Sequence, residues 1–144
     1  MTAAAAVAVA ALFTWVGMVL AISFVEAPLK FRAPGVTLPI GLGIGRLVFR
    51  ALNTIETLLA VLIVAAALLG SLPPGANAAI AVAVVALLVQ LGVVRPLLAR
   101  RSDAVLADPE AASHKRSRVH LLYVGLELVK LVALIAAGVV LLAA

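Results

Sequence analysis

The chain has 144 residues, of which 66% are hydrophobic and 12% are charged. Soluble globular domains are nearer about 45–50% apolar and about 25% charged, so this composition excludes an ordinary soluble domain and indicates a membrane protein. The absence of cysteine excludes disulfides and thiolate metal sites, and the net charge of +5 fits basic loops beside a membrane better than a nucleic-acid partner.

Four apolar segments are each long enough to cross a bilayer core of about 30 Å. Their Ala-, Val- and Leu-rich composition favours helices over a β-barrel, whose strands would alternate apolar and polar residues. We predict an all-α integral membrane four-helix bundle forming a single domain over residues 1–144. Its helices are expected at about 2–25, 46–69, 78–98 and 119–142, joined by connectors at 26–45 and 99–118.

The two longer connectors contain distinct local signals. Pro28 and Pro34 are expected to end the first helix. Gly41 and Gly45 have the spacing of a small-residue packing face, which we favour over a phosphate loop because no strand precedes them. This segment either lies on the interface or begins the second helix early. Asp108, followed by a proline, predicts the start of a short surface helix.

The distribution of basic residues predicts the orientation. Lysine and arginine occur in and beside both longer connectors, whereas the N-terminal tip and the turn at 71–77 have none. Because basic loops stay in the cytoplasm, both longer connectors should be cytoplasmic and both termini extracytoplasmic. The sequence therefore predicts a multi-pass protein of the cell membrane.

Polar side chains recur at helical spacing within three of the apolar segments. His120, Tyr123, Glu127 and Lys130 share one face of the last helix, and a charged face must avoid lipid. Glu127 and Lys130 lie about 12 Å and 17 Å into the last helix, and the second and third helices place Glu56 and Gln90 at a similar depth, about 14 Å and 12 Å from their cytoplasmic ends. The candidate ligand- or ion-binding residues are Arg50, Asn53, Glu56, Gln90, His120, Tyr123, Glu127 and Lys130.

Two interpretations of these residues stay open. As structural elements, the Glu127–Lys130 and Glu56–Arg50 pairs would fix how the helices pack, each polar interaction contributing about 0.6 kcal/mol. As a functional site, Glu56 and Glu127 would line a cytoplasmic cavity that binds a cation or a proton, or with Lys130 an anion.

The sequence offers little support for a metal centre or an enzyme. The two histidines, His114 and His120, are six positions apart and cannot ligate one metal from adjacent helical turns. A site built from His120 and Glu127 is the remaining metal option, so the cofactor is left undetermined. No serine–histidine–acid arrangement lies in the apolar segments, which favours a protein that is not an enzyme.

Short motifs resemble a known family. Phe24-Val25-Glu26-Ala27-Pro28-Leu29-Lys30-Phe31, Pro34 and Gly45-Arg46-Leu47-Val48-Phe49-Arg50 look like the small bacterial membrane proteins similar to the transmembrane-protein-205-like group. At the last helix, His120 matches the family pattern, whereas Glu127 replaces a neutral polar residue. The resemblance implies a four-helix membrane fold and carries over no catalytic residue.

We therefore expect transport or permeation of a small ion or solute through the polar cluster. The alternative is a non-catalytic accessory subunit that packs against a larger membrane complex. Because four short helices enclose little volume and carry Ala- and Gly-rich faces, we also expect a homo-oligomer or a larger assembly in the lipid bilayer.

Overall fold

The computed structural model describes residues 1–108 and 118–144, and within these ranges the chain is helical with no strand. Four helical segments are long and apolar enough to span a membrane: Ala3–Arg32, Leu38–Leu69, Pro74–Ala107 and Arg118–Ala143. This confirms the predicted all-helical chain with four helices of membrane-spanning length and composition. The elements are α1 (Ala3–Val19), η1 (Leu20–Glu26), α2 (Ala27–Leu29), η2 (Lys30–Arg32), α3 (Leu38–Leu69), α4 (Pro74–Val89), η3 (Gln90–Val94), α5 (Arg95–Ala107) and α6 (Arg118–Ala143).

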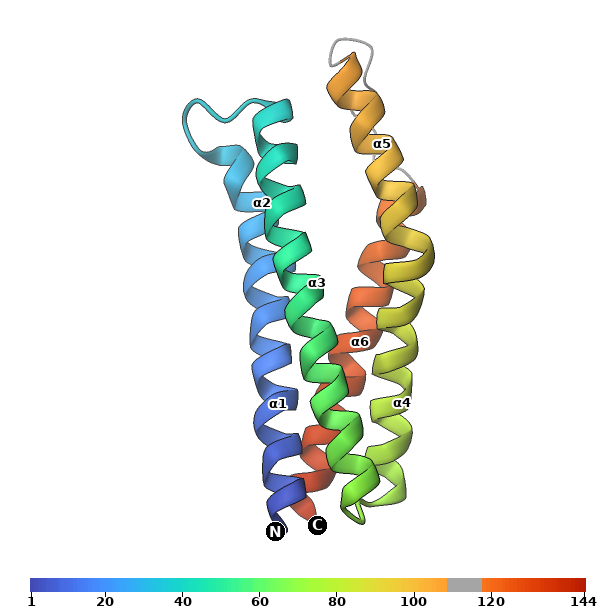
Figure 1. Ribbon diagram of the computed structural model, residues 1–144. Helices are drawn as coiled ribbons and strands as arrows, with labels where there is room; N and C mark the ends of the chain where they lie inside the picture. Colours follow the sequence, from blue (N-terminus) through green and yellow to red (C-terminus); the bar gives the residue numbers. More distant parts are fainter. Residues whose placement is uncertain (109–117) are drawn as a thin grey trace.

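The four segments form an up-and-down bundle (Figure 1). Helix α6 packs along both α1 and α4, and α1 also packs along α3, whereas α3 and α4 contact each other much less. Both termini and the turn between α3 and α4 lie at one end, which we call the terminal end. Elements α2, η2 and α5 lie at the other, which we call the basic end because it carries Lys30, Arg46 and Arg100.

The first two helices extend further than the sequence predicts. The first continues through Pro28 to Arg32, because the preceding segment η1 is a π-helix. In η1 the wider hydrogen bonding runs five residues back, as in the bond from the Ala27 N–H to the Ile22 carbonyl. At the other side of the loop, Thr37 accepts a bond from the Ile40 N–H at 3.4 Å and caps α3. Helix α3 therefore begins early, in agreement with one of the two sequence alternatives.

The third segment repeats this arrangement and corrects the predicted connector. A second π-helix, η3, precedes Pro96, and the Arg95 N–H donates to the Gln90 carbonyl five residues back. Because a wider turn displaces the carbonyl with which a proline ring collides, the helix continues as α5 to Ala107. The part of the predicted connector from 99 to 107 is thus helical. Asp108 follows the end of α5, and the surface helix predicted from Asp108 onward lies outside the described residues.

Gly41 and Gly45 form a packing surface, in agreement with the packing interpretation of their spacing. A Cβ atom at Gly41 would overlap the ring of Phe31, and one at Gly45 would lie 3.1 Å from Nζ of Lys30. The absence of side chains on this face of α3 therefore lets η2 lie directly against the helix backbone. Gly35, in the intervening loop, has a φ of 81°, a conformation that glycine adopts without strain.

We expect Gly41→Ala to be less stable than Gly43→Ala, although both add one methyl group to the same helix. Alanine is favoured over glycine in a helix by up to about 1 kcal/mol, and nothing lies within 4 Å of a Cβ at Gly43. At Gly41 the methyl group must displace Phe31, which costs about 1 kcal/mol or more. Thermal unfolding in detergent, followed by circular dichroism, measures the difference. Equal unfolding temperatures would contradict the close packing of Phe31 on α3.

Candidate functional site

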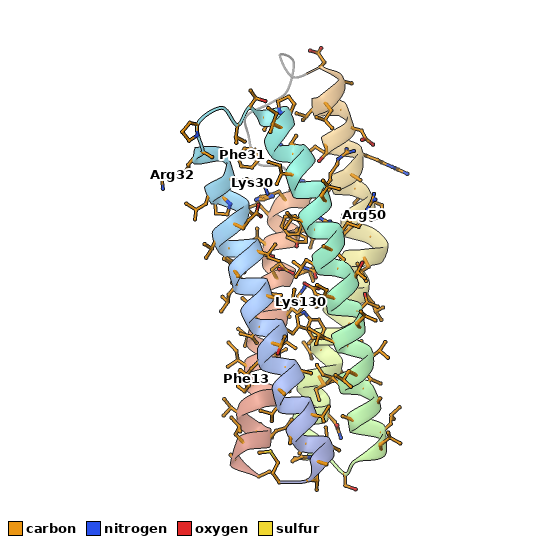
Figure 2. The ribbon with its side chains drawn as sticks, turned by 60° about the vertical axis from the view of Figure 1, so that its left-hand side comes forward. Phe13, Lys30, Phe31, Arg32, Arg50 and Lys130 are labelled. Atoms are coloured by element: carbon orange, nitrogen blue, oxygen red, sulfur yellow. The ribbon has the colours of Figure 1, made fainter. Side chains whose placement is uncertain are left out.

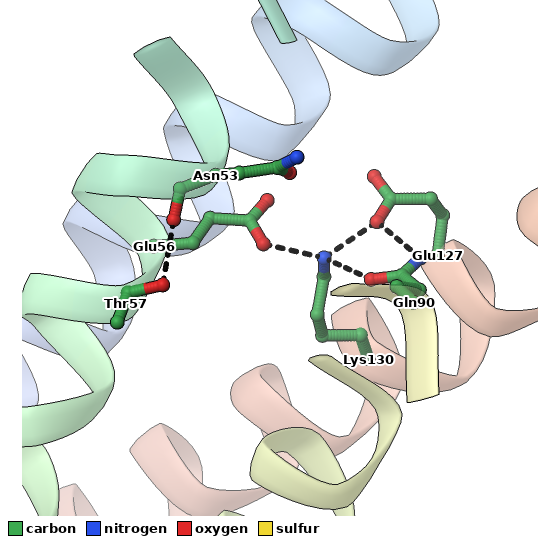
Figure 3. A network of polar contacts seen from close by, with 6 residues as sticks. All are labelled: Asn53, Glu56, Thr57, Gln90, Glu127 and Lys130. Atoms are coloured by element: carbon green, nitrogen blue, oxygen red, sulfur yellow. Dashed lines mark hydrogen bonds and ion pairs between the residues drawn. The ribbon is translucent and has the colours of Figure 1, made fainter. Parts of the chain in front are cut away.

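Four polar side chains from three helices meet inside the bundle, and we call them the quartet: Glu56, Gln90, Glu127 and Lys130 (Figure 3). Lys130 Nζ lies 2.9 Å from Glu56 Oε2, 2.5 Å from Glu127 Oε1 and 2.8 Å from Gln90 Oε1. Gln90 Nε2 in turn donates to Glu127 Oε1 at 2.7 Å. All four residues are at most 2% exposed. The ammonium group is thus fully bonded inside the bundle.

The helical repeat of α6 aims two members of the quartet inward. Tyr123, Glu127, Lys130 and Leu134 are all buried and follow one another by three or four positions, so they occupy one face. That face looks toward Glu56 of α3 and toward Gln90 at the junction of α4 and η3. The predicted stripe on the last helix therefore meets its predicted counterparts on the second and third helices.

The quartet contains more negative than positive charge when its acids are ionised. Two carboxylates share the single ammonium of Lys130, which leaves one excess negative charge. Oε1 of Glu56 and Oε2 of Glu127 are buried, and neither has a hydrogen-bond partner within residues 1–108 and 118–144. Because buried carboxylate oxygens are costly to leave unpaired, this arrangement suits the uptake of a proton or another cation. In Figure 3 the Asn53 side chain lies beside Glu56.

A large pocket lies between the quartet and the basic end. Its volume is about 1200 Å³, and Glu127 and Tyr123 are among the side chains that line it. Asn53, Thr57 and Ser23 add neutral polar groups to its walls. By contrast, the terminal half of the bundle is filled by an apolar core that includes Leu12, Ile63, Ile80, Ala137 and Leu141. The pocket is therefore closed toward the terminal end.

Positive charge dominates the described walls of this pocket. Lys30, Arg46, Arg50 and Arg95 line it, against the one carboxylate of Glu127. Figure 2 shows Lys30 and Arg50 near the basic end, well above Lys130. Cationic side chains with one acid at the floor make a surface that attracts anions.

The ring of Phe49 organises the cationic wall. Lys30 Nζ lies 5.7 Å and Arg95 Cζ 5.0 Å from the ring centroid, both within the range of cation–π contacts. Tyr123 meets the same ring edge to face, with the centroids 5.9 Å apart. Phe49 thus holds two cations from different helical segments at the same level of the pocket.

Arg46 joins the two sides of the pocket near the basic end. Its guanidinium group pairs with Asp103 and donates to the Ala99 carbonyl at 3.3 Å, so α3 is tied to α5. This pair is solvent-exposed, and exposed ion pairs contribute about 0–1 kcal/mol. The link positions the pocket walls more than it stabilises the fold.

The structure separates the eight predicted site residues into two groups. Glu56, Gln90, Glu127 and Lys130 form the quartet, while Arg50, Asn53, His120 and Tyr123 line the pocket together with Glu127. The predicted Glu56–Arg50 pair is absent from the ion pairs among the described residues, where Glu56 pairs with Lys130 instead. Because α3 continues straight through both residues, Glu56 points inward and Arg50 is exposed.

Sequence reasoning missed three residues of the site. The sequence pattern places Lys30 in the connector at 26–45 and Arg95 near the end of the helix predicted at 78–98, but both lie on helical extensions beyond a π-helix and line the pocket. Trp15, which the sequence pattern does not connect to the site, is 1% exposed, and its ring centroid lies 6.0 Å from Lys130 Nζ. The sequence signal that could have identified Lys30 and Arg95 is a nearby proline within an apolar run, Pro28 for Lys30 and Pro96 for Arg95.

Comparisons with known proteins assign no family to this chain. No family model, curated protein or solved structure matches it. The resemblance to the transmembrane-protein-205-like group therefore stays a prediction. Within the described parts of the chain, no group of three or more histidine or acidic side chains could hold a metal ion. His114 lies outside the described residues.

Proposed function

We propose that the protein is a membrane carrier for a small charged solute, with the structure representing a state open at its basic end. The observation that supports this proposal is the position of the quartet: a buried ionic cluster lies at the floor of a large pocket that extends toward the basic end. Ionisable groups inside a membrane mark solute or proton pathways, and carriers bind their solutes near the middle of the bilayer.

The bonds within the quartet are arranged so that breaking one of them could open the closed end of the pocket. Lys130 and Glu127 lie on α6, and Gln90 lies at the end of α4, a helix that packs extensively along α6. Helices α3 and α6 pack much less closely, so the 2.9 Å bond from Lys130 to Glu56 is a bridge between them. A solute or proton that separates this pair would release α3 from α6. This release would begin to open the apolar terminal half.

The basic end is proposed to face the cytoplasm. It carries Lys30, Arg32 and Arg46 on one side and Arg100 and Arg101 on the other, whereas the terminal end carries no lysine or arginine. Under the positive-inside rule this places the pocket opening in the cytoplasm and both termini outside. The solute would then enter from the cytoplasmic side.

Flux in proteoliposomes tests the carrier. We expect the parent protein to take up at least one of three labelled probes, namely benzoate, inorganic phosphate or methylamine. Glu127→Gln and Glu56→Gln are each expected to lower that flux at least tenfold, because each removes a charge on which the Lys130 bridge depends. Glu26→Gln is the matched control, since Glu26 pairs with Lys30 outside the quartet and should retain most of the flux.

Size-exclusion chromatography and circular dichroism of each variant separate a loss of function from a loss of fold. Well-folded Glu127→Gln and Glu56→Gln proteins with parental flux would contradict a role of the quartet in transport. No flux of any probe in the parent would remove the carrier proposal. If a stoichiometric membrane partner also co-purified, that result would favour the accessory-subunit alternative.

A further inference from the structure

The pocket walls indicate which class of solute they bind. We propose that the pocket takes an organic anion with one carboxylate or phosphate head and an apolar body, the head bound by Arg95 and Lys30. This inference names the substrate class of the proposed carrier and so rests on that function. Charge, aromatic contacts and pocket size each support it.

Arg95 is placed to bind an anion. Its side chain is half-buried, lies on the Phe49 ring and lines the pocket. Among the described residues its guanidinium forms no ion pair with a carboxylate. A half-buried arginine gains most from a bidentate partner, and carboxylate and phosphate groups match its geometry.

Lys30 brings a second cation to the same level. Its side chain is 9% exposed, and its carboxylate contact, to Glu26, is a long one at 3.4 Å. Nζ of Lys30 lies against the backbone of α3 at Gly45, where a Cβ would approach it to 3.1 Å. Two cations held on the Phe49 ring repel each other, and an anion bound near both reduces that repulsion.

The apolar side chains that line the pocket would contact the apolar body of the solute. Leu91 and Val124 line the pocket beside Gln90 and Tyr123, whereas Phe31 and Leu42 line it toward the basic end. The volume of about 1200 Å³ exceeds the 300–1,000 Å³ of typical small-molecule sites, so there is room for a chain or ring beyond the head group. At the floor, the Glu127 carboxylate keeps the anionic head away from the quartet. The head is therefore proposed to bind at the level of Phe49, away from the floor, with the body lying along the apolar part of the lining.

Calorimetric titration of the purified full chain in a nonionic detergent tests this inference with octanoate, octyl phosphate and octylamine. These probes share one apolar chain and differ in their heads. We expect octanoate and octyl phosphate to bind at least tenfold more tightly than octylamine. Arg95→Met should weaken octanoate binding at least tenfold, and Arg95→Lys less. Arg32→Met is the matched control, because Arg32 is exposed, points away from the bundle and does not line the pocket (Figure 2).

Three results would overturn the inference: tighter binding of octylamine, no binding of either anion, or unchanged octanoate affinity in a well-folded Arg95→Met protein. Failure of the carrier proposal gives a different result, namely octanoate binding without flux of any probe. Methylamine flux without octanoate binding would retain the carrier and reject the anion.

The bound anion could be the headgroup of a membrane lipid or a free solute, and a competition experiment distinguishes the two. Displacement of octanoate by phosphatidylglycerol, but not by phosphatidylcholine, in mixed micelles is expected if the anion is a lipid. Displacement by octyl phosphate alone is expected if it is a free solute. Displacement by none of these would overturn the inference, since no anionic head would then share the octanoate site.

Discussion

Replacing Lys130 with methionine is expected to lower the free energy of unfolding by about 3–5 kcal/mol, the usual range when one partner of a buried ion pair is removed. Methionine preserves the bulk of the side chain but leaves two carboxylates facing each other inside the bundle. Glu127 keeps its bond from Gln90 Nε2, whereas Glu56 Oε2 loses its bond to Lys130. Titration of the detergent-solubilised protein with sodium dodecyl sulfate, followed by circular dichroism, measures this change.

Removing the carboxylates should rescue this variant. The triple variant Lys130→Met, Glu56→Gln, Glu127→Gln is expected to recover most of the lost stability, because it leaves no uncompensated charge. Glu56→Gln alone should change stability by about 1 kcal/mol or less, since the Lys130–Glu127 pair and the Gln90 bonds persist. A Lys130→Met protein as stable as the parent would show that water reaches the quartet.

Replacing Trp15 with alanine is the second change with a large expected effect, a loss of about 3–5 kcal/mol. The side chain is 1% exposed and belongs to the apolar core, so its removal leaves a cavity beside the quartet. It also removes the ring that lies 6.0 Å from Lys130 Nζ. The same detergent titration measures the loss, again by circular dichroism because Trp15 is the single tryptophan of the chain.

Phenylalanine is the matched control at this position. Trp15 Nε1 has no hydrogen-bond partner within the described parts of the chain, so Trp15→Phe loses no such bond and fills most of the space. We expect it to cost less than half of what alanine costs. If the two substitutions were equally destabilising, the indole N–H would have a bonded partner and the packing explanation would be wrong.

The sequence placed the four quartet residues among its eight candidates because they recur at helical spacing, although it paired Glu56 with Arg50 and not with Lys130. Glu127 and Lys130 are three positions apart within an apolar run, and a charged face in such a run must look into protein. Depth along a helix follows from the rise per residue, so Glu56 and Gln90 could be placed at the same level. Helix number and the inward stripe of α6 were predictable for the same reason.

The pocket was not predictable because it depends on departures from the regular helix. The π-helices η1 and η3 add residues to a turn, rotate the faces of the next helical turns and let the helix continue beyond a proline. A regular 3.6-residue pattern places Pro28 at a helix end and Arg95 near the end of the helix predicted at 78–98. Whether the chain ends a helix or widens a turn at proline depends on tertiary packing, which one sequence does not reveal.

Glu127 and Lys130 lie one helical turn apart, so α6 carries a charge and its countercharge together. A helix with an internal ion pair enters a bilayer with much less unfavourable energy than one with the same charges unpaired. Among the described residues, Glu56 on α3 has no ion-pair partner on its own helix and pairs across the bundle with Lys130. In the proposed membrane protein, we therefore expect α3 to insert stably into the bilayer only after α6 has been synthesised and has inserted beside it.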